Sequence, residues 1–329
     1  MIYLITGGAG YIGSCVSQFL IDKGHKVIII DNLSTGLKKN IPKKSIFIHC
    51  NINNYYKLDK IFKRFKIDIV MHFAAFINNE ESINNPEKYF KNNYHNGKLF
   101  FKFCIENNIK KVIYSSTAAV YGNKKKKVSE KDTLKPMSPY PKSKLLLEKY
   151  LEKNKKKINC VILRYFNVAG ADKNYRCGFN IHKGYNLILN LCRSVYLNKK
   201  LRVNGKNYKT KDGTTIRDFI HVRDLAEIHY KVSKLLNKKK IFLKLNCGYG
   251  FGFSVLEILK EFIKVSKKNI NYQFTQKRKG DIIISISNPS KLKKTIRWSP
   301  KNHSLNSIVK SSLDWFKKSS KKKIGTKGF

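Results

Sequence analysis

Residues 2–13 read IYLITGGAGYIG, an apolar run followed by a glycine-rich turn and then by residues that can form a helix. The glycines permit backbone conformations with positive φ and let a phosphate group approach the main chain. The first turn of the helix offers free N–H groups and the positive end of the helix dipole to an anion. The stretch therefore predicts a pyrophosphate-binding turn. Its residues are Gly7, Gly10, Tyr11, Ile12 and Gly13.

A second apolar run, residues 27–30, ends in Asp31, which lies 18 residues after Gly13. A carboxylate at this point can accept hydrogen bonds from an adenosine ribose, and it would repel a 2′-phosphate. Strand, glycine turn, helix, strand and acid follow one another as they do in dinucleotide sites. The sequence therefore predicts NAD, rather than NADP, as the cofactor.

Apolar stretches alternate with helical segments through the first half of the chain. Strands are expected at residues 2–6, 26–30, 45–49, 68–73, 111–115 and 160–164, and helices near residues 11–23, 55–65, 86–107 and 139–153. This alternation predicts an α/β fold with a doubly wound, Rossmann-like parallel sheet. The expected organisation is a NAD-binding domain at 1–167, a smaller substrate lobe at 168–316 and a basic tail at 317–329, with a strand near 243–246 returning to the main sheet.

Composition indicates a folded protein, since 42% of the 329 residues are hydrophobic. No apolar stretch reaches the ~18–20 residues that span a bilayer, and no basic segment precedes an apolar one at the start, so no membrane association and a cytoplasmic location are expected. The seven cysteines are scattered and never form a Cys-x-x-Cys pair. Reduced thiols, without a metal site or disulfide framework, are therefore expected.

The net charge of +47 arises from 68 Lys and Arg residues against 21 Asp and Glu residues. The lysines occur in nearly every segment, and no RNA- or DNA-binding motif accompanies them. We interpret them as a solvated surface, with no specific nucleic-acid partner. Weak binding to polyanions that disappears with added salt is the expected consequence.

Two further motifs carry the chemistry: residues 114–122 read YSSTAAVYG, and residues 138–145 read SPYPKSKL. Tyr140 and Lys144 are four residues apart and share one face of a predicted helix. Because a free tyrosine has a pKa near ~10, it needs nearby cations, such as Lys144 and an oxidised nicotinamide ring, to act as a base. The phenolate can then take the proton of a substrate hydroxyl while hydride leaves the same carbon. Thr117, at the end of a strand, is placed to hydrogen-bond that oxygen.

Together these motifs resemble the extended short-chain dehydrogenase/reductases, and within them the UDP-glucose 4-epimerase family, over about residues 1–315. The resemblance rests on residues 7–14 (GGAGYIGS), 31–33 (DNL), 72–75 (HFAA), 81–82 (ES), 92–93 (NN), 114–117 (YSST), 140–144 (YPKSK), 164–171 (RYFNVAGA), 212–222 (DGTTIRDFIHV) and 278–281 (RKGD). The last three blocks lie outside the generic nucleotide fold and make the resemblance specific.

The resemblance implies that NAD is bound tightly and that a UDP-sugar is the substrate. Beyond the glycine turn, it assigns the cofactor to Asp31, Asn32, Ser34, Thr35, Gly36, Asn51, Ile52, Phe73, Ala74, Ala75, Asn93, Tyr140, Lys144 and Phe166. It assigns the substrate to Thr117, Asn167, Asn186, Arg217, Arg278, Asp281 and Ser285. Arginines suit this role because their guanidinium forks onto pyrophosphate oxygens. The helices at 86–107 and 139–153 are expected to form a homodimer surface.

Three departures from the family pattern bear on the site. Asn51 stands where the family has an aspartate that meets the adenine amine, but its carbonyl can still accept a hydrogen bond. Asn204 stands where an aromatic residue near the uracil is expected. Ala118 and Ala119 stand where related dehydratases carry an acidic pair. The last departure favours redox chemistry at C4 of the sugar over removal of water.

The implied activity is interconversion of UDP-galactose and UDP-glucose through a 4-keto intermediate. Ser285 extends it, because relatives restricted to this pair carry a bulky tyrosine there and relatives with a small residue accept N-acetylhexosamines. Alternatives are an epimerase of other UDP-sugars, such as N-acetylhexosamines or uronates, an NAD-dependent dehydrogenase with exchangeable cofactor, and a non-catalytic nucleotide- or nucleic-acid-binding relative. The presence of Thr117, Tyr140 and Lys144 favours an enzyme.

Overall fold

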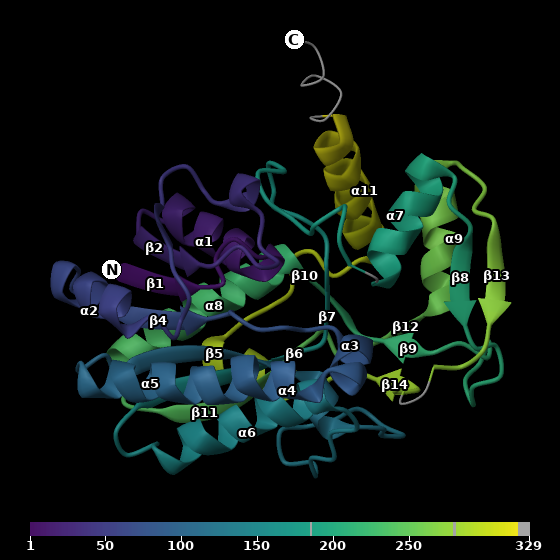
Figure 1. Cartoon of the computed structure of the whole chain (residues 1–329). Helices are drawn as coiled ribbons and strands as arrows, with labels where there is room; N and C mark the ends of the chain where they lie inside the picture. Colours follow the sequence, from purple (N-terminus) through teal and green to yellow (C-terminus); the bar gives the residue numbers. More distant parts are fainter. Residues whose placement is uncertain (185, 279–280, 322–329) are drawn as a thin grey trace.

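The computed structural model describes residues 1–184, 186–278 and 281–321 (Figure 1). Within these residues, seven parallel strands form the central sheet in the order β11-β6-β5-β4-β1-β2-β3. The strands are β1 (Ile2–Thr6), β2 (Lys26–Asp31), β3 (Ile46–His49), β4 (Ile69–His72), β5 (Lys111–Thr117), β6 (Asn159–Tyr165) and β11 (Phe242–Cys247). The predicted Rossmann-like, doubly wound sheet is confirmed, and all six predicted strands are present.

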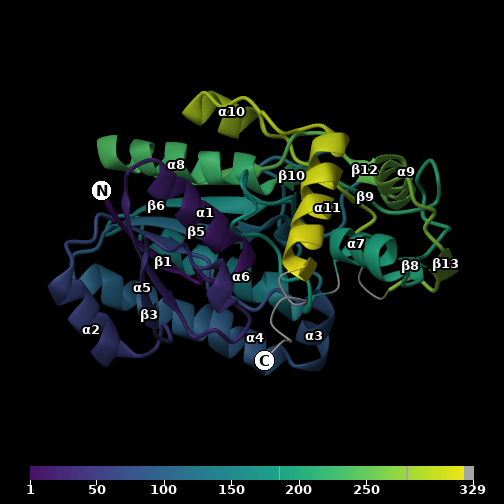
Figure 2. The ribbon, with the colours of Figure 1, turned by 90° about the horizontal axis from the view of Figure 1, so that it is seen from above.

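Helices cover both faces of this sheet because successive side chains of each strand point to opposite faces. Tyr3 and Ile5 of β1 pack in one core with α1 (Tyr11–Asp22) and α8 (Val222–Lys238). Leu4 packs in the other core with α2 (Tyr55–Arg64), α5 (Gly97–Glu106) and α6 (Pro139–Lys153). Figure 2 shows the two helical layers on either side of the sheet. Strands buried on both faces explain the uninterrupted apolar runs of the sequence.

The helix predicted at 86–107 is one continuous helical stretch with a wider turn in its middle. It consists of α4 (Pro86–Tyr89), the π-helix η2 (Phe90–Asn96) and α5. A short helix that was not predicted, α3 (Asn79–Asn84), precedes it and is capped by the Asn78 side chain. Single π-turns occur frequently at functional sites. The η2 turn places Asn93 in a buried position behind the loop that follows β4.

The smaller lobe lies beyond one end of the sheet (Figure 1). Its helices are α7 (Leu187–Leu197), α9 (Val255–Ser266) and α11 (Leu305–Lys321). Its strands are β8 (Leu201–Asn204) with β13 (Tyr272–Thr275), and β9 (Ile216–Arg217) between β12 (Phe253–Ser254) and β14 (Ile284–Ser285). The remaining elements are β7 (Asn167–Ala169), β10 (Phe219–His221), η1 (Lys38–Asn40), η3 (Ala118–Tyr121) and α10 (Ser290–Ile296). One apolar core runs from the sheet into this lobe, so the two are packed together.

The end of the chain is helical further than the sequence suggested. α11 continues through residues 317–321, the first part of the expected basic tail, because Phe316 and Ser319 still face the core. Residues 322–329 of that tail lie outside the described residues. β11 carries the strand expected near 243–246, and it pairs with β6 at the edge of the sheet.

The residues that the structure describes show neither a membrane-spanning helix nor a metal-binding cluster. In this part of the chain, no helix combines the length and apolar character needed to cross a bilayer. The same residues contain no group of three or more His, Cys, Asp or Glu side chains arranged to hold a metal ion. All seven cysteines are buried free thiols, and Cys15 and Cys177 approach to 3.5 Å between sulfur atoms.

Candidate active site

The glycine-rich turn lies between β1 and α1. Gly7 has a positive φ of +70°, and a methyl group on it would come within 2.6 Å of the Ala74 nitrogen. The turn is thus packed directly against the segment that follows β4. α1 begins at Tyr11 with no side-chain cap and no acidic residue in its first turn. Its amino end can therefore receive an anion such as a pyrophosphate.

The Asp31 carboxylate, at the end of β2, is fixed beside this turn. Its Oδ2 accepts a hydrogen bond from the Ala9 amide (2.9 Å), and its Oδ1 accepts one from the Leu33 amide (2.8 Å). The residue is only 8% exposed. Because each carboxylate oxygen has a further lone pair, Asp31 can also accept hydrogen bonds from a ribose. The arrangement fits the adenosine half of NAD.

Other predicted cofactor residues follow β2 and β3. Asn51 is partly buried, and its side-chain oxygen receives only a long hydrogen bond of 3.4 Å from the Asn53 amide. This oxygen can still accept a hydrogen bond from an adenine amine. The rest range from exposed to buried: Asn32, Ser34 and Thr35 are exposed, Gly36 is intermediate and Ile52 is buried.

The segment after β4 is held by backbone contacts and by Asn93. The Phe73 amide donates to the Thr6 carbonyl (3.0 Å), and the Ala74 amide donates to the Thr6 hydroxyl (3.3 Å). The Asn93 side chain accepts from the Phe76 amide and donates to the Phe76 carbonyl, both at 2.9 Å. Asn93 is 1% exposed, so its observed role is to fix this loop. A direct contact between Asn93 and a dinucleotide remains a prediction.

Thr117, Tyr140 and Lys144 lie where the sequence predicted, with Thr117 as the last residue of β5 and the other two in the first turns of α6. The Thr117 side chain forms a hydrogen bond with Tyr140. Thr117 Oγ also accepts the Ala119 amide (3.2 Å), which leaves its proton for the Tyr140 oxygen or for a ligand. Lys144 is 3% exposed, and its Nζ lies 4.6 Å from the centre of the Tyr114 ring.

Burial changes the proton affinity of both α6 side chains in a direction that suits proton exchange. Burial lowers the pKa of Lys144 to about 7, against the opposing effect of the Glu148 carboxylate. Burial raises the pKa of Tyr140, and the hydrogen bond from Thr117 partly offsets that effect. A buried lysine with a pKa near neutrality, one helical turn from a partly buried tyrosine, is a candidate for an acid–base site.

A second cluster, which we call the arginine cluster, consists of Tyr208, Arg217, Arg278 and Asp281. Arg278 Nη2 and the Tyr208 hydroxyl both donate to the Asp281 carboxylate, each at 3.0 Å. Arg217 Nη1 donates to the Ile283 carbonyl at 3.2 Å. Burial lowers the pKa of Arg217 to about 10, an effect that Asp281 opposes and Arg278 reinforces. The structure thus gathers three predicted substrate residues, two of them cationic.

Sequence reasoning missed Tyr208 in this cluster. The available signal was an aromatic residue three positions after Gly205. In the structure the Tyr208 ring packs so closely on Gly205 that a methyl group there would lie 2.5 Å from the ring. The expected aromatic position, Asn204, is instead tied to the neighbouring strand, where its side chain accepts from the Thr275 hydroxyl (2.9 Å). Lys279 and Gly280, within the 278–281 motif, lie outside the described residues.

The strand β14 connects the arginine cluster to the end of β5. Ser285 is paired in register with Arg217 of β9 and is partly buried. The Ile283 amide donates to the side chain of Asn123, six residues after Thr117 (2.8 Å). The predicted sugar-proximal residue and the predicted catalytic strand are therefore joined through one short segment.

The remaining predicted residues are more dispersed. Phe166 is buried in a small core with Ala118, which follows Thr117 in the chain, and with Leu145, which follows Lys144. Asn167 is exposed on β7. Asn186 caps α7, since its side chain accepts the Leu189 amide at 2.9 Å. Ligand contacts of the last two residues remain predictions.

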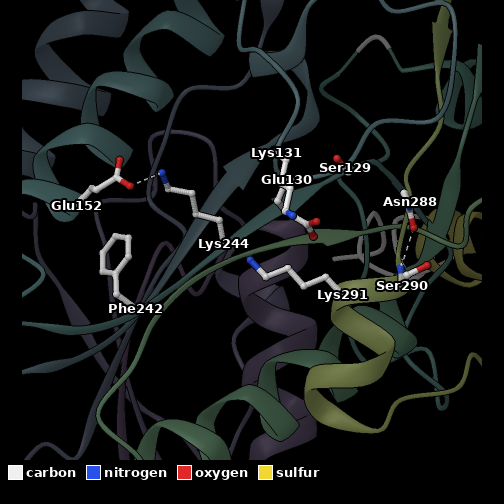
Figure 3. Close-up of a pocket in the computed structure, with 9 residues that line it drawn as sticks. All are labelled: Ser129, Glu130, Lys131, Glu152, Phe242, Lys244, Asn288, Ser290 and Lys291. Carbon is white, nitrogen blue, oxygen red and sulfur yellow. Dashed lines mark hydrogen bonds and ion pairs between the residues drawn. The ribbon is translucent and has the colours of Figure 1, made fainter.

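A cavity elsewhere contains none of the predicted residues (Figure 3). It has a volume of about 430 Å³ and lies at the β11 edge of the sheet. Its walls are Ser129, Glu130, Lys131, Glu152, Phe242, Lys244, Asn288, Ser290 and Lys291. Lys244 pairs with Glu152 across it at 2.7 Å. Because none of the predicted site residues lines this cavity, we do not place the active site there.

Comparison with known proteins agrees with this geometry. Residues 3–248 match the model of the NAD dependent epimerase/dehydratase family. UDP-glucose 4-epimerase of Azospirillum brasilense is 37% identical over 99% of this chain and 94% of its own length.

Solved structures are similar over almost the whole chain. UDP-glucose 4-epimerase from Stenotrophomonas maltophila, with bound NAD and formylated UDP-arabinopyranose, superposes with a TM-score of 0.94 at 29% identity, covering 98% of this chain and 99% of that one. The UDP-Glc/GlcNAc 4-epimerase of Campylobacter jejuni superposes with a TM-score of 0.83 at 36% identity, covering 96% and 99%. These matches show that the chain belongs to the NAD dependent epimerase/dehydratase family.

Proposed function

We propose that this chain is an NAD-dependent UDP-glucose 4-epimerase that interconverts UDP-galactose and UDP-glucose. The observation that carries the proposal is the contact between Thr117 and Tyr140 beside the buried Lys144, at the end of β5. The arginine cluster supports the UDP part of the substrate. No acidic side chain follows Thr117, where Ala118 and Ala119 stand, so the site lacks the acid that a dehydration would need.

The residues of this site fit NAD. The glycine turn with the open end of α1 would hold its pyrophosphate, and Asp31 would hold its adenosine ribose. Tyr140 and Lys144 would face its nicotinamide ribose. When bound, NAD supplies the hydride acceptor and donor that inversion at C4 through a 4-keto sugar requires.

Tyr140 is the base in this mechanism. Its phenolate takes the proton of the C4 hydroxyl as that carbon is oxidised, and it returns the proton when the 4-keto sugar is reduced on its other face. Thr117 donates a hydrogen bond to the C4 oxygen of the sugar, which stabilises the negative charge that develops on that oxygen. The Lys144 ammonium lowers the cost of forming the phenolate.

The substrate must be held firmly at one end and loosely at the other. Arg217 and Arg278 can each donate two hydrogen bonds to pyrophosphate oxygens, whereas the proposed reaction requires the hexose itself to be held loosely. A sugar held in this way can turn over between the two half-reactions. Both C4 epimers are then produced in one site.

The decisive experiment is to incubate the purified protein with UDP-galactose without added cofactor. An epimerase forms UDP-glucose over many turnovers with no net NADH. A dehydrogenase would require added NAD and would accumulate one NADH for each oxidation at the sugar. Absence of UDP-glucose with or without added NAD would refute the proposed activity.

We predict that the nucleotide released from the denatured protein is NAD. Two like charges about 4 Å apart repel by ~4 kcal/mol in a protein-like medium, so Asp31 should disfavour NADP by roughly 10³-fold. Chromatography of the released nucleotide, after purification without added cofactor, measures this. Recovery of mainly NADP would contradict the role of Asp31, and recovery of none would favour the dehydrogenase or the non-catalytic alternative.

We also predict that the enzyme accepts UDP-N-acetylglucosamine and UDP-N-acetylgalactosamine. Ser285, beside Arg217, is small, and Ser285→Tyr would fill the space of an acetamido group. The variant should lower kcat/KM for the N-acetyl pair about 10–100-fold and should spare the unmodified pair, since a clash rejects one substrate only.

The matched control is Ser290→Tyr, the same change at an exposed position on α10 in the wall of the separate cavity. It should leave both activities unchanged. A wild-type protein without N-acetyl activity, or a Ser285→Tyr variant that loses both activities equally, would show that Ser285 does not set substrate breadth.

We further propose a homodimer in the cytoplasm, with the helices at 86–107 (α4, η2 and α5) and 139–153 (α6) as the contact surface. Leu99 on α5 is 44% exposed, which supports an apolar contribution from this face. Light scattering of the purified protein would measure its mass in solution. A monomer at micromolar concentration would argue against the dimer.

A further inference from the structure

Below the proposed catalytic residues, Glu148 of α6 and Arg164 of β6 form an ion pair inside the protein. Arg164 Nη2 lies 2.6 Å from Glu148 Oε2, and Arg164 Nε lies 3.1 Å from Glu148 Oε1. Both side chains are 1% exposed. The contact is bidentate, which is the strongest geometry for an arginine and a carboxylate.

Further hydrogen bonds extend this pair across three strands. Ser116, the register partner of Arg164, donates to Glu148 Oε1 at 2.5 Å. Arg164 Nη1 donates to the Tyr121 hydroxyl (2.8 Å), which donates in turn to the Asn246 side chain on β11 (2.7 Å). The Glu148 carboxylate thus ties α6 directly to β5 and β6, and through Arg164 and Tyr121 to β11.

The position of Glu148 relates this network to the active site. Tyr140, Lys144 and Glu148 follow one another at intervals of four residues, so they share one face of α6. On β5, Ser116 immediately precedes Thr117. The hydrogen bond between Ser116 and Glu148 therefore joins β5 to α6 next to Thr117 and one helical turn after Lys144.

The Glu148 carboxylate is also the negatively charged group that acts on Lys144. The ionisable groups that interact with Lys144, Glu148 or Tyr140 include His72 on β4, Tyr114 on β5, and Cys160, Arg164 and Tyr165 on β6. Burial, reinforced by Lys144, lowers the pKa of His72 to about 3, so this ring is neutral. Burial raises the pKa values of the Tyr114, Tyr165 and Cys160 side chains, which stay protonated.

Stability alone does not account for this arrangement. Desolvation of a buried ion pair commonly cancels its attraction, and apolar residues of similar volume often serve as well. By contrast, a carboxylate close to an ammonium group has a specific effect, because it stabilises the positive charge of that group. Glu148 opposes the loss of the Lys144 proton that burial favours.

We propose that Glu148 is a positioning residue for epimerisation. Held by Arg164 and Ser116, it fixes α6 so that Tyr140 meets Thr117, and its carboxylate keeps the Lys144 ammonium beside the Tyr140 oxygen. The inference rests on the proposed function for its kinetic consequences. Its effect on the protons of Tyr140 and Lys144 does not depend on the identity of the sugar.

The test is Glu148→Gln, which keeps the shape and removes the charge. With Arg164 left as an uncompensated cation, the Lys144 ammonium becomes less stable, so the Tyr140–Lys144 pair loses its first proton at lower pH. The acid limb of the kcat profile should move down by about one pH unit. A smaller share of the pair then carries its proton on Lys144, and kcat should fall about tenfold. KM for UDP-galactose should stay within about twofold, because the arginine cluster is untouched.

Two variants serve as comparisons. Glu152→Gln makes the same change one turn further along α6, where the side chain is 47% exposed and pairs with Lys244; it should leave kcat and its pH profile unchanged. Glu148→Gln with Arg164→Met removes both buried charges, and its acid limb should lie between those of the wild type and the single variant. The double variant also keeps the test possible if the unpaired Arg164 prevents folding.

A second measurement does not use turnover. The ultraviolet difference spectrum of the holoprotein against its Tyr140→Phe variant follows the Tyr140 phenolate with pH. In the Glu148→Gln background, the onset of the first proton loss should shift downward and the phenolate share near neutrality should fall. If the wild type proves inactive on UDP-sugars, the proposed function fails, whereas this titration still tests Glu148.

Unchanged titration in folded Glu148→Gln protein would overturn the inference, even if kcat fell, because the residue would then be only structural. The same conclusion follows if the double variant matches the wild type in both kcat and acid limb. A downward shift that Glu152→Gln does not reproduce supports the role of Glu148.

Discussion

Replacement of Tyr140 by phenylalanine is expected to reduce kcat by about 10²–10⁴-fold, the usual contribution of a general base. The substitution deletes the hydroxyl that takes the substrate proton and that bonds Thr117. It keeps the ring, whose centre lies 6.4 Å from that of Tyr89, so the packing of α6 and the retention of NAD should persist. Initial rates with UDP-galactose and the NAD content of the purified protein measure the two effects.

Tyr89→Phe is the matched control, since it removes a hydroxyl from the neighbouring ring. That hydroxyl donates to Glu81 at 2.9 Å and has no role in the proposed chemistry, so kcat should change less than about threefold. Thr117→Ala should slow the reaction less than Tyr140→Phe, because Tyr140 can still reach the sugar oxygen. Wild-type turnover in Tyr140→Phe would show that the base has been misassigned.

Replacement of Gly13 by alanine is expected to abolish the retention of NAD and with it the activity. The added methyl group would overlap the Gly7 carbonyl oxygen and would lie 3.0 Å from the Gly8 α-carbon. Gly7 cannot move away, because it already packs against the Ala74 backbone on its other side. Overpacking of this kind costs about 1–3 kcal/mol, and the relief available is to displace the glycine turn from the pyrophosphate position. Thermal denaturation and nucleotide release report the two effects separately.

Gly24→Ala separates loss of stability from loss of cofactor. Gly24 has a φ of +78° with no atom within 4 Å of an added methyl group, so this substitution costs backbone strain of roughly 1–2 kcal/mol without a clash. It should lower the melting temperature comparably and still retain NAD. If Gly13→Ala retained NAD as fully as Gly24→Ala does, the glycine turn would not be the pyrophosphate site.

The elements of the NAD-binding half follow from local patterns. Short apolar runs mark β1, β2 and β4, because strands buried on both faces need no polar alternation. The four-residue interval between Tyr140 and Lys144 places both on one helix face whatever the helix packs against. The positions of Gly7, Asp31 and Thr117 at strand ends were likewise readable, because the ends of parallel strands meet at one edge of the sheet.

Other features depend on contacts between distant residues. Tyr208 and Asp281 are 73 residues apart, and only the packing of the smaller lobe brings the hydroxyl to the carboxylate. The π-turn that buries Asn93 follows no sequence motif, so the sequence predicted one uninterrupted helix over these residues. Asn186 illustrates the same point, because a helix cap and a substrate contact use the same side-chain oxygen.

From its sequence alone, this chain was determined to be a doubly wound α/β protein with a dinucleotide turn and a tyrosine–lysine pair, since each of these depends on spacing within one or two neighbouring elements. Only the tertiary structure decided which charges are buried. Arg164 begins one of the motifs that carry the family resemblance, but nothing in the sequence distinguishes it as a buried charge among the 68 Lys and Arg residues. Its burial against Glu148 follows from the register of β5 and β6 beneath α6, and burial decides how strongly a charge acts on its neighbours, because water no longer screens it.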